Sequence, residues 1–131
     1  METASTAKLS NYRQAPRKVR LVADLIRGKG AQHAINLLSI LPKRAGEPMM
    51  KLVKSAVSNA SKDGHAVEDL YISTIAVNGG IVAKRSMPRA RGRASQILKR
   101  TSHITLALAK KAPKKADAKA GKKADAAEAT Q

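Results

Sequence analysis

Residues 84–100 read KRSMPRARGRASQILKR, and they lie between two stretches of strand type, LYISTIAV at 70–77 and ITLAL at 104–108. The first stretch is rich in β-branched and aromatic residues, which favour strands. In the second, large apolar residues alternate with smaller or polar ones, as expected for a strand with one buried face. The pattern predicts two strands joined by a long basic connection.

We expect the two stretches to pair as one antiparallel hairpin. If Leu70 lies opposite Leu108, the turn falls near Pro88 and Arg89, where proline favours chain reversal. Each arm then has about fifteen residues and spans roughly 50 Å at ~3.3 Å per residue. Because a domain of this size has a radius of gyration of only about 13 Å, the hairpin, at about residues 80–97, must project beyond the body.

The connection at residues 84–100 carries seven basic residues and no acidic one. Five of the seven are Arg, whereas the basic residues of 110–131 are all Lys. A guanidinium group binds phosphate through two hydrogen bonds and stacks on bases, while an ammonium group is a hydrated point charge. We therefore expect specific phosphate contacts in the hairpin and diffuse attraction from the C-terminal residues. The alternative, a charged loop that only confers solubility, is unusual without any compensating carboxylate.

The region before the hairpin has the apolar spacing of three helices. The expected ranges are 16–27, opened by Pro16 and stopped by Gly28; 31–41, stopped by Pro42; and about 48–62, stopped by Asp63 and Gly64. In the first helix Leu21 and Leu25 widen the apolar stripe, so we expect other elements to contact this helix from more than one side.

Polar residues on these helices have two interpretations each. Arg17, Arg20 and Arg27 lie opposite the apolar stripe of the first helix, either as a basic binding face or as a solvated face in which Arg20 and Arg27 pair with Asp24. Asn59 lies at the edge of the third apolar stripe, where a buried, hydrogen-bonded structural role is favoured over a contact with a ligand.

Composition excludes several classes of protein. The chain has 131 residues, a net charge of +17 and no Cys, so disulfide frameworks, thiolate zinc sites and cysteine nucleophiles are ruled out. Its three His are scattered without the spacing of a metal pair, and no glycine-rich phosphate loop or hydrolase motif is present. We expect no enzyme, no cofactor and no metal.

The charge points to a polyanionic partner, because self-repulsion of this size disfavours a compact chain unless it is neutralised. A membrane surface is disfavoured by the absence of Trp and Phe, and no signal peptide or membrane span is visible. With only two Tyr, base stacking on aromatic platforms is nearly excluded. Recognition through phosphate, 2′-hydroxyl and shape favours folded RNA.

The chain divides at about residue 109. Residues 1–109 carry the apolar patterns and are expected to form one domain, whereas residues 110–131 contain no Leu, Ile, Val or Met. Such a segment has nothing to bury that could offset the entropy of ordering. We expect 110–131 to be a disordered basic tail, or a transient Ala/Lys helix.

Deleting residues 110–131 should therefore cost little stability. The expected result is a thermal midpoint of the free protein close to that of the full chain, measured by circular dichroism. A large loss of midpoint would contradict this interpretation.

Four strings in the sequence resemble the family of bacterial large-subunit ribosomal protein 22. The resemblance covers roughly residues 8–109. The strings are RKVRLVADLIRGK at 17–29, SAVSNA at 55–60, PRARGRA at 88–94 and KRTSHIT at 99–105. Small departures from the family pattern are Ser58 in place of Ala, Ala15 in place of a capping Ser, and a third helix that Gly46 and Pro48 are expected to delay or bend.

The resemblance implies an α+β fold, with three helices packed on a small antiparallel sheet and a long protruding β-hairpin. It also implies a cytoplasmic structural protein of the large ribosomal subunit that binds several domains of 23S rRNA and supports early assembly. Its implied partners include neighbouring large-subunit ribosomal proteins and the nascent peptide, because the hairpin of the family lines the polypeptide exit tunnel. No membrane is involved.

The RNA-binding residues that the resemblance implies come from the hairpin tip, the hairpin base, the first helix and the residues just before it. They are Arg13, Arg17, Lys18, Arg20, Arg27, Lys84, Arg85, Arg89, Arg91, Arg93, Lys99, Arg100, Thr101, Ser102 and His103. The alternative function is an architectural protein that binds duplex DNA with its basic β-arm in the minor groove.

Overall fold

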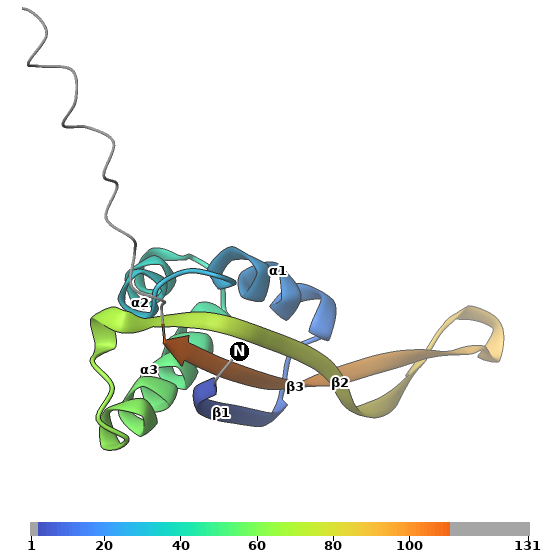
Figure 1. Ribbon diagram of the computed structural model, residues 1–131. Coiled ribbons are helices and arrows are strands. Elements are labelled where there is room, and N and C mark those ends of the chain that lie inside the picture. The colour runs from blue at the N-terminus through green and yellow to red at the C-terminus, as the bar shows by residue number, and fades with distance from the viewer. Residues whose placement is uncertain (1–2, 111–131) are drawn as a thin grey trace, which may run out of the picture.

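The computed structural model describes residues 3–110, which form three antiparallel strands and three helices. The helices lie on one face of the sheet, and the hairpin extends away from it (Figure 1). The elements are β1 (Thr3–Tyr12), α1 (Pro16–Ile26), α2 (Ala31–Ile40), α3 (Gly46–Lys62), β2 (Leu70–Pro88) and β3 (Ala94–Lys110), with single 3₁₀ turns at Val67–Asp69 and Ala90–Gly92. The expected α+β class is confirmed.

The core lies between the sheet and the helices. In β3 the side chains of Ser102, Ile104, Leu106 and Leu108 are buried, while those between them are partly or fully exposed on the opposite face. This alternation is the one that the sequence predicts for a strand covered on one side. The helices contribute Val19, Val22, Ala23 and Ile26 from α1; Ala31, Ala34 and Leu38 from α2; and Met49, Leu52, Val53, Ala56 and Ala60 from α3.

The prediction that α1 is contacted from several sides is wrong. Leu21 is 71% exposed and Leu25 40% exposed, because α1 packs on β2 and β3 with one face and no second layer covers the other. The start of α1 is as expected: Pro16 is the first helical residue, and Ala15 makes no side-chain cap hydrogen bond.

Helix α3 begins two residues earlier than expected, at Gly46. Pro48 falls in the first turn, where its missing N–H would have had no partner within the helix. A Cβ on Gly46 would lie 3.2 Å from the carbonyl oxygen of Leu38, so glycine allows α3 to start close against α2.

Strand β1 was not expected from the sequence. It pairs with β3 from Thr3 opposite Ala109 to Tyr12 opposite Ser102. Helix α3 holds β1 from the side, since Ser5 donates to the carbonyl of Ala56 at 2.8 Å.

Asn59 of α3 also contacts β1, donating to the carbonyl of Thr6 at 3.2 Å. The structural role expected for Asn59 is confirmed, but its expected burial is wrong, because the side chain is exposed.

The long hairpin is confirmed, with a corrected register. Leu70 lies opposite Lys110 and Ile72 opposite Leu108, and the tip is centred on the 3₁₀ turn Ala90–Gly92. Irregularities at Ile72/Thr74 and Gly79/Val82 shift the pairing, and such local insertions cannot be read from strand periodicity. Lys110 therefore belongs to the last strand, and the expected disorder of the remaining tail residues lies outside the described residues.

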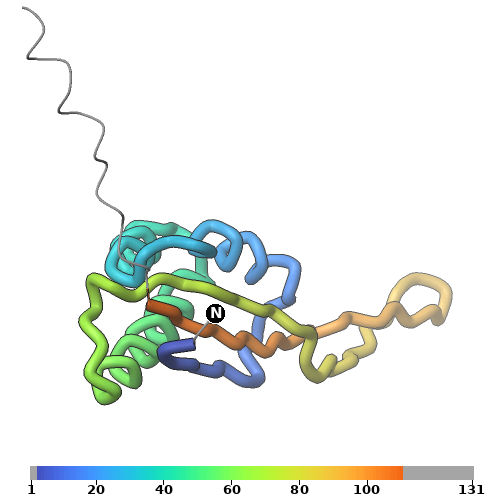
Figure 2. Tube along the Cα trace, in the orientation of Figure 1, coloured from blue at the N-terminus to red at the C-terminus, as the bar shows by residue number. Residues whose placement is uncertain are grey.

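The hairpin leaves the body after the pair Gly79 and Ser102. None of residues 80–101 is buried, and we call this segment the arm. In the Cα trace of Figure 2 the two strands of the arm cross and run together away from the helices.

The α1–α2 connection covers the start of the outer edge of β2. Gly28 donates its N–H to the carbonyl of Ile72 at 3.0 Å, and the N–H of Ile72 donates to the carbonyl of Lys29 at 2.9 Å. A bridge between Gly30 and Tyr71 continues this contact.

Candidate nucleic-acid interface

The arm tip presents three guanidinium groups around a tight turn. Arg89 donates its backbone N–H to the carbonyl of Arg93 at 2.7 Å, and Arg91 lies at the apex with φ +59°. A non-glycine residue in this left-handed region is strained by about 1–2 kcal/mol. Because strained backbone of this kind clusters at functional sites, Arg91 is a candidate contact residue at the apex of the tip.

The shaft of the arm carries cations on both faces. Residues directly opposite in an antiparallel pair share a face, so Lys84 lies with Leu98 on one face and Arg85 with Ile97 on the other. Lys99 and Arg100 extend the two faces toward the body. A ribbon that lay against a single surface would need only one basic face, so this arrangement fits an arm enclosed by its partner.

The arm also exposes large apolar side chains among its cations. Ile81 is 73% exposed, and Met87, Ile97 and Leu98 are each more than 40% exposed. Water is a poor environment for such residues, so this supports a partner that covers the arm rather than one that touches only its tip.

A basic cleft lies where the arm meets the body. It has a volume of about 770 Å³ and is lined by residues from the β1–α1 connection, α1, the α2–α3 loop and both strands of the arm. Five cations and no acidic residue line it. These cations are Arg13, Lys18, Arg44, Lys99 and Arg100.

Arg44 is a member of this cleft that the sequence interpretation missed. It lies in the α2–α3 loop, far along the chain from the other four cations, and is brought there by tertiary structure. Tyr12 helps to hold this loop, because its hydroxyl donates to the carbonyl of Arg44 at 3.2 Å. The only signal in the sequence was the adjacent pair of cations Lys43 and Arg44 after Pro42.

Arg20 of α1 and Arg27, which directly follows α1, both donate hydrogen bonds to carbonyls at the edge of β2. Arg20 donates from Nε and Nη2 to the carbonyl of Val77 at 3.2 and 3.1 Å, and Arg27 donates to the carbonyl of Ile75 at 3.2 Å. Arg27 also pairs with Asp24 at 3.1 Å. The expected pairing with Asp24 is thus found for Arg27 but not for Arg20, which bonds only the backbone carbonyl of Val77. These bonds hold both side chains in place, although Arg20 and Arg27 are exposed, as is Arg17 in the first turn of α1.

The three polar residues at the arm base make different contacts. Thr101 donates through Oγ1 to the carbonyl of Ile81 at 2.7 Å, and His103 accepts the N–H of Asn11 at Nδ1, 3.1 Å away. Ser102 is fully buried, and its Oγ has no hydrogen-bond partner within residues 3–110. Its side chain therefore does not reach the surface, and we leave it out of the interface.

Acidic residues are segregated from the arm. Residues 70–110 contain none, whereas the segment between α3 and β2, which holds Asp63, Glu68 and Asp69, lies at the end of the body opposite the arm (Figure 1). Glu47 pairs with Lys51 at 2.7 Å, and this hydrogen bond lowers the pKa of the Glu47 carboxyl. The arm and the basic cleft thus form one continuous positive surface, suited to a polyanion.

Within the described part of the chain, no group of three or more His, Asp or Glu side chains is placed to hold a metal ion. Over the same residues, no helix combines the length and hydropathy needed to cross a bilayer.

Comparison with known proteins identifies the family. The family model of ribosomal protein L22p/L17e matches residues 7–109. The "Large ribosomal subunit protein uL22" of Trichlorobacter lovleyi is 54% identical over 105 residues, which are 79% of this chain and 93% of the relative. That of Geotalea uraniireducens is 55% identical over 108 residues, covering 82% of this chain and 97% of the relative.

A third relative of the same name, from Herpetosiphon aurantiacus, is 50% identical over 101 residues, covering 76% of this chain and 89% of the relative. All three relatives are named as ribosomal proteins, which agrees with the expectation that the chain is not an enzyme. The match spans β1 from Ala7, the three helices and the whole hairpin. The chain belongs to the ribosomal protein L22p/L17e family.

Proposed function

We propose that this protein is a structural component of the large ribosomal subunit in the cytoplasm and binds 23S rRNA through the arm and the basic cleft. The observation that carries the proposal is the distribution of charge on the arm. Cations stand on both of its faces, no acidic residue occurs between positions 70 and 110, and none of its side chains is buried. A folded RNA presents phosphates on many of its surfaces, so a ribbon that lies between RNA helices can meet phosphate on both of its faces.

The interface residues fall into three groups. The tip uses Arg89, Arg91 and Arg93, the shaft uses Lys84 and Arg85, and the cleft uses Arg13, Lys18, Arg44, Lys99 and Arg100. Arg17, Arg20 and Arg27 extend the positive surface along α1, with Thr101 and His103 at the arm base. The two fixed arginines of α1 act as positioned charges, since their hydrogen bonds to β2 hold them in place.

The shape of the arm supports the finer part of the proposal. Two strands about 4.8 Å apart form a narrow ribbon that can pass between rRNA helices, so one protein can contact several rRNA domains and act early in assembly. Its tip then reaches the wall of the polypeptide exit tunnel, beside the nascent peptide. The helical body stays outside, where neighbouring large-subunit proteins can contact it.

The salt dependence of RNA binding tests this function. Binding of the full-length protein to a 23S rRNA transcript should weaken with salt by roughly 0.7–0.9 log units per log unit of salt for each phosphate neutralised. Arg13→Gln and Arg100→Gln together remove two cations of the cleft. They should make the slope of log affinity against log salt concentration shallower by about 1.5.

A matched control removes the same charge from the exposed side of α3, with Lys54→Gln and Lys62→Gln. This variant should keep the slope of the unmodified protein. A shallow slope for the unmodified protein, or equal slopes for the two variants, would contradict the assignment of RNA binding to the cleft.

The architectural DNA-binding alternative is tested in the same assay. We expect the rRNA transcript to outcompete a duplex DNA of equal nucleotide number. Equal or stronger binding to the duplex would favour the alternative.

A further inference from the structure

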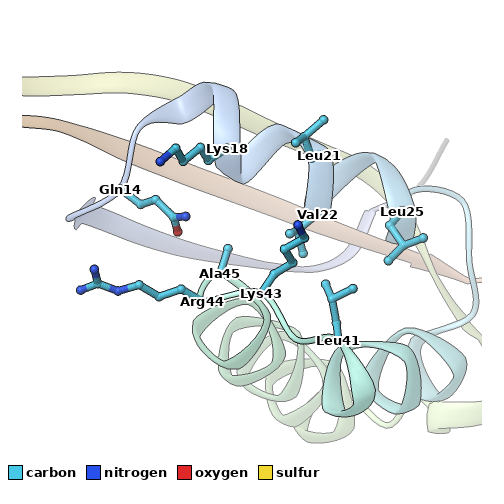
Figure 3. Close-up of a pocket in the computed structure, with 9 residues that line it drawn as sticks. All are labelled: Gln14, Lys18, Leu21, Val22, Leu25, Leu41, Lys43, Arg44 and Ala45. Carbon is cyan, nitrogen blue, oxygen red and sulfur yellow. The ribbon is translucent and has the colours of Figure 1, made fainter.

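An apolar groove adjoins the basic cleft. It has a volume of about 430 Å³ and lies between α1 and the loop that joins α2 to α3 (Figure 3). Its apolar lining consists of Leu21, Val22, Leu25, Leu41 and Ala45. Leu21 and Leu25 are one helical turn apart, and they are exposed although nothing in the body requires it. Apolar side chains that lie together in a concave, exposed place are typical of binding sites.

The groove and the cleft share an end. Gln14, Lys18 and Arg44 line both cavities, and in Figure 3 they lie together at one end of the groove, with Leu25 toward the other. Lys43 also lines the groove, so its polar rim is basic and contains no acidic residue. A ligand that lies in both cavities would place a negative group in the basic cleft and an apolar group in the groove.

The Gln14 amide adds a hydrogen-bonding group at this junction. Its Oε1 is buried and has no hydrogen-bond partner within the described residues. A buried polar atom left without a hydrogen-bond partner is destabilising. Rotation of the side chain toward a ligand would remove this cost, and an amide offers both a donor and an acceptor to the edge of a base.

We propose that the groove holds one unpaired nucleobase of the bound RNA, while the phosphates of that nucleotide lie in the basic cleft. This inference rests on the proposed function. Leu21 and Leu25 would pack against the face of the base, and Gln14 would bond its edge. The base must be unpaired, because the faces of a base within a duplex are covered by its neighbours. A protein segment fits less well, since the basic rim and the adjoining cleft call for phosphate.

Chemical probing of a 23S rRNA transcript tests the proposal. Dimethyl sulfate, a carbodiimide and kethoxal together report the base edges of all four nucleotides. The full-length protein should protect one unpaired nucleotide whose neighbouring phosphates lie in the footprint of the cleft. With Leu21→Ser, the protein concentration needed to protect this nucleotide should rise about tenfold, as expected for the loss of one base–side-chain packing contact. The rest of the footprint should keep its midpoint.

Ile40→Ser is the matched control, because Ile40 is 81% exposed and does not line the groove. This variant should protect every nucleotide as the unmodified protein does. Gln14→Ala, like Leu21→Ser, should raise the protein concentration needed to protect the nucleotide in the groove. If Leu21→Ser and Ile40→Ser protect the nucleotide equally well, the inference is overturned. If the Leu21→Ser protein binds RNA normally but is lost from large subunits, the groove binds a neighbouring protein instead. Absence of any footprint refutes instead the proposed function.

Discussion

Reversing two charges at the arm tip with Arg91→Glu and Arg93→Glu is expected to remove most of the protein from large subunits while leaving its body folded. Both side chains are exposed at a tip that contacts no part of the core. Each reversal replaces an attraction to phosphate by a repulsion, and the two together change the local charge by four units. We expect affinity for the rRNA transcript to fall by about 10²-fold at 0.1 M salt.

Sedimentation of large subunits followed by quantification of the bound protein measures this effect. The thermal midpoint of the free variant should match that of the unmodified protein, because no buried group is altered. Lys54→Glu with Lys62→Glu makes the same change of charge on α3 and is the control. If both double variants were incorporated equally, net charge rather than the tip would govern assembly.

Gly80→Ala is expected to disturb the direction of the arm and the stability of its base. A Cβ at this position would lie 2.6 Å from Oγ1 of Thr101 and 2.9 Å from Nε2 of His103. Neither neighbour can yield freely, since Thr101 bonds the carbonyl of Ile81 and His103 bonds the N–H of Asn11. Overpacking of this kind costs about 1–3 kcal/mol. In a domain of this size we expect the thermal midpoint to fall by about 5–15 °C.

Gly79→Ala provides the control for this prediction. No heavy atom lies within 4 Å of a Cβ built on Gly79, and its backbone is not in the left-handed region. The variant should melt within about 2 °C of the unmodified protein and enter subunits normally. Equal midpoints for the Gly79 and Gly80 variants would show that the irregularity at the arm base tolerates a side chain, and that glycine there has another cause.

Most of the fold could be predicted because its signals are local. The apolar stripes of the helices and their glycine and proline limits depend on residues close in sequence, and the hairpin follows from two apolar stretches with a basic connection. Strand β1 could not be predicted, because it contains few large apolar residues. It is stabilised instead by contacts distant in sequence, namely its pairing with β3 and the hydrogen bond from Ser5 to the carbonyl of Ala56. The register could not be read, because irregular pairs such as Gly79/Val82 insert residues that periodicity does not record.

The candidate site was predictable only where cations cluster along the chain. The arm was visible as an unbroken run of basic residues, but the inclusion of Arg44 in the cleft depends on how the α2–α3 loop folds against β1. Periodicity also failed for Leu21 and Leu25, since a stripe shows which residues are apolar and not whether another element covers them. The burial of Ser102 could not be predicted either, because it depends on which face of β3 the helices cover and not on the residues next to Ser102 in the sequence.

The hydrogen bonds along the outer edge of β2 have a consequence for the protein before it meets its partner. Gly28 and Lys29 bond Ile72, Arg27 bonds Ile75 and Arg20 bonds Val77, so these positions offer little to an incoming strand. An uncovered edge is a template for aggregation. This stretch of β2 is therefore a poor template for a strand of another chain while the protein awaits assembly, and neutralising Arg20 or Arg27 should raise the turbidity of the free protein at a given concentration.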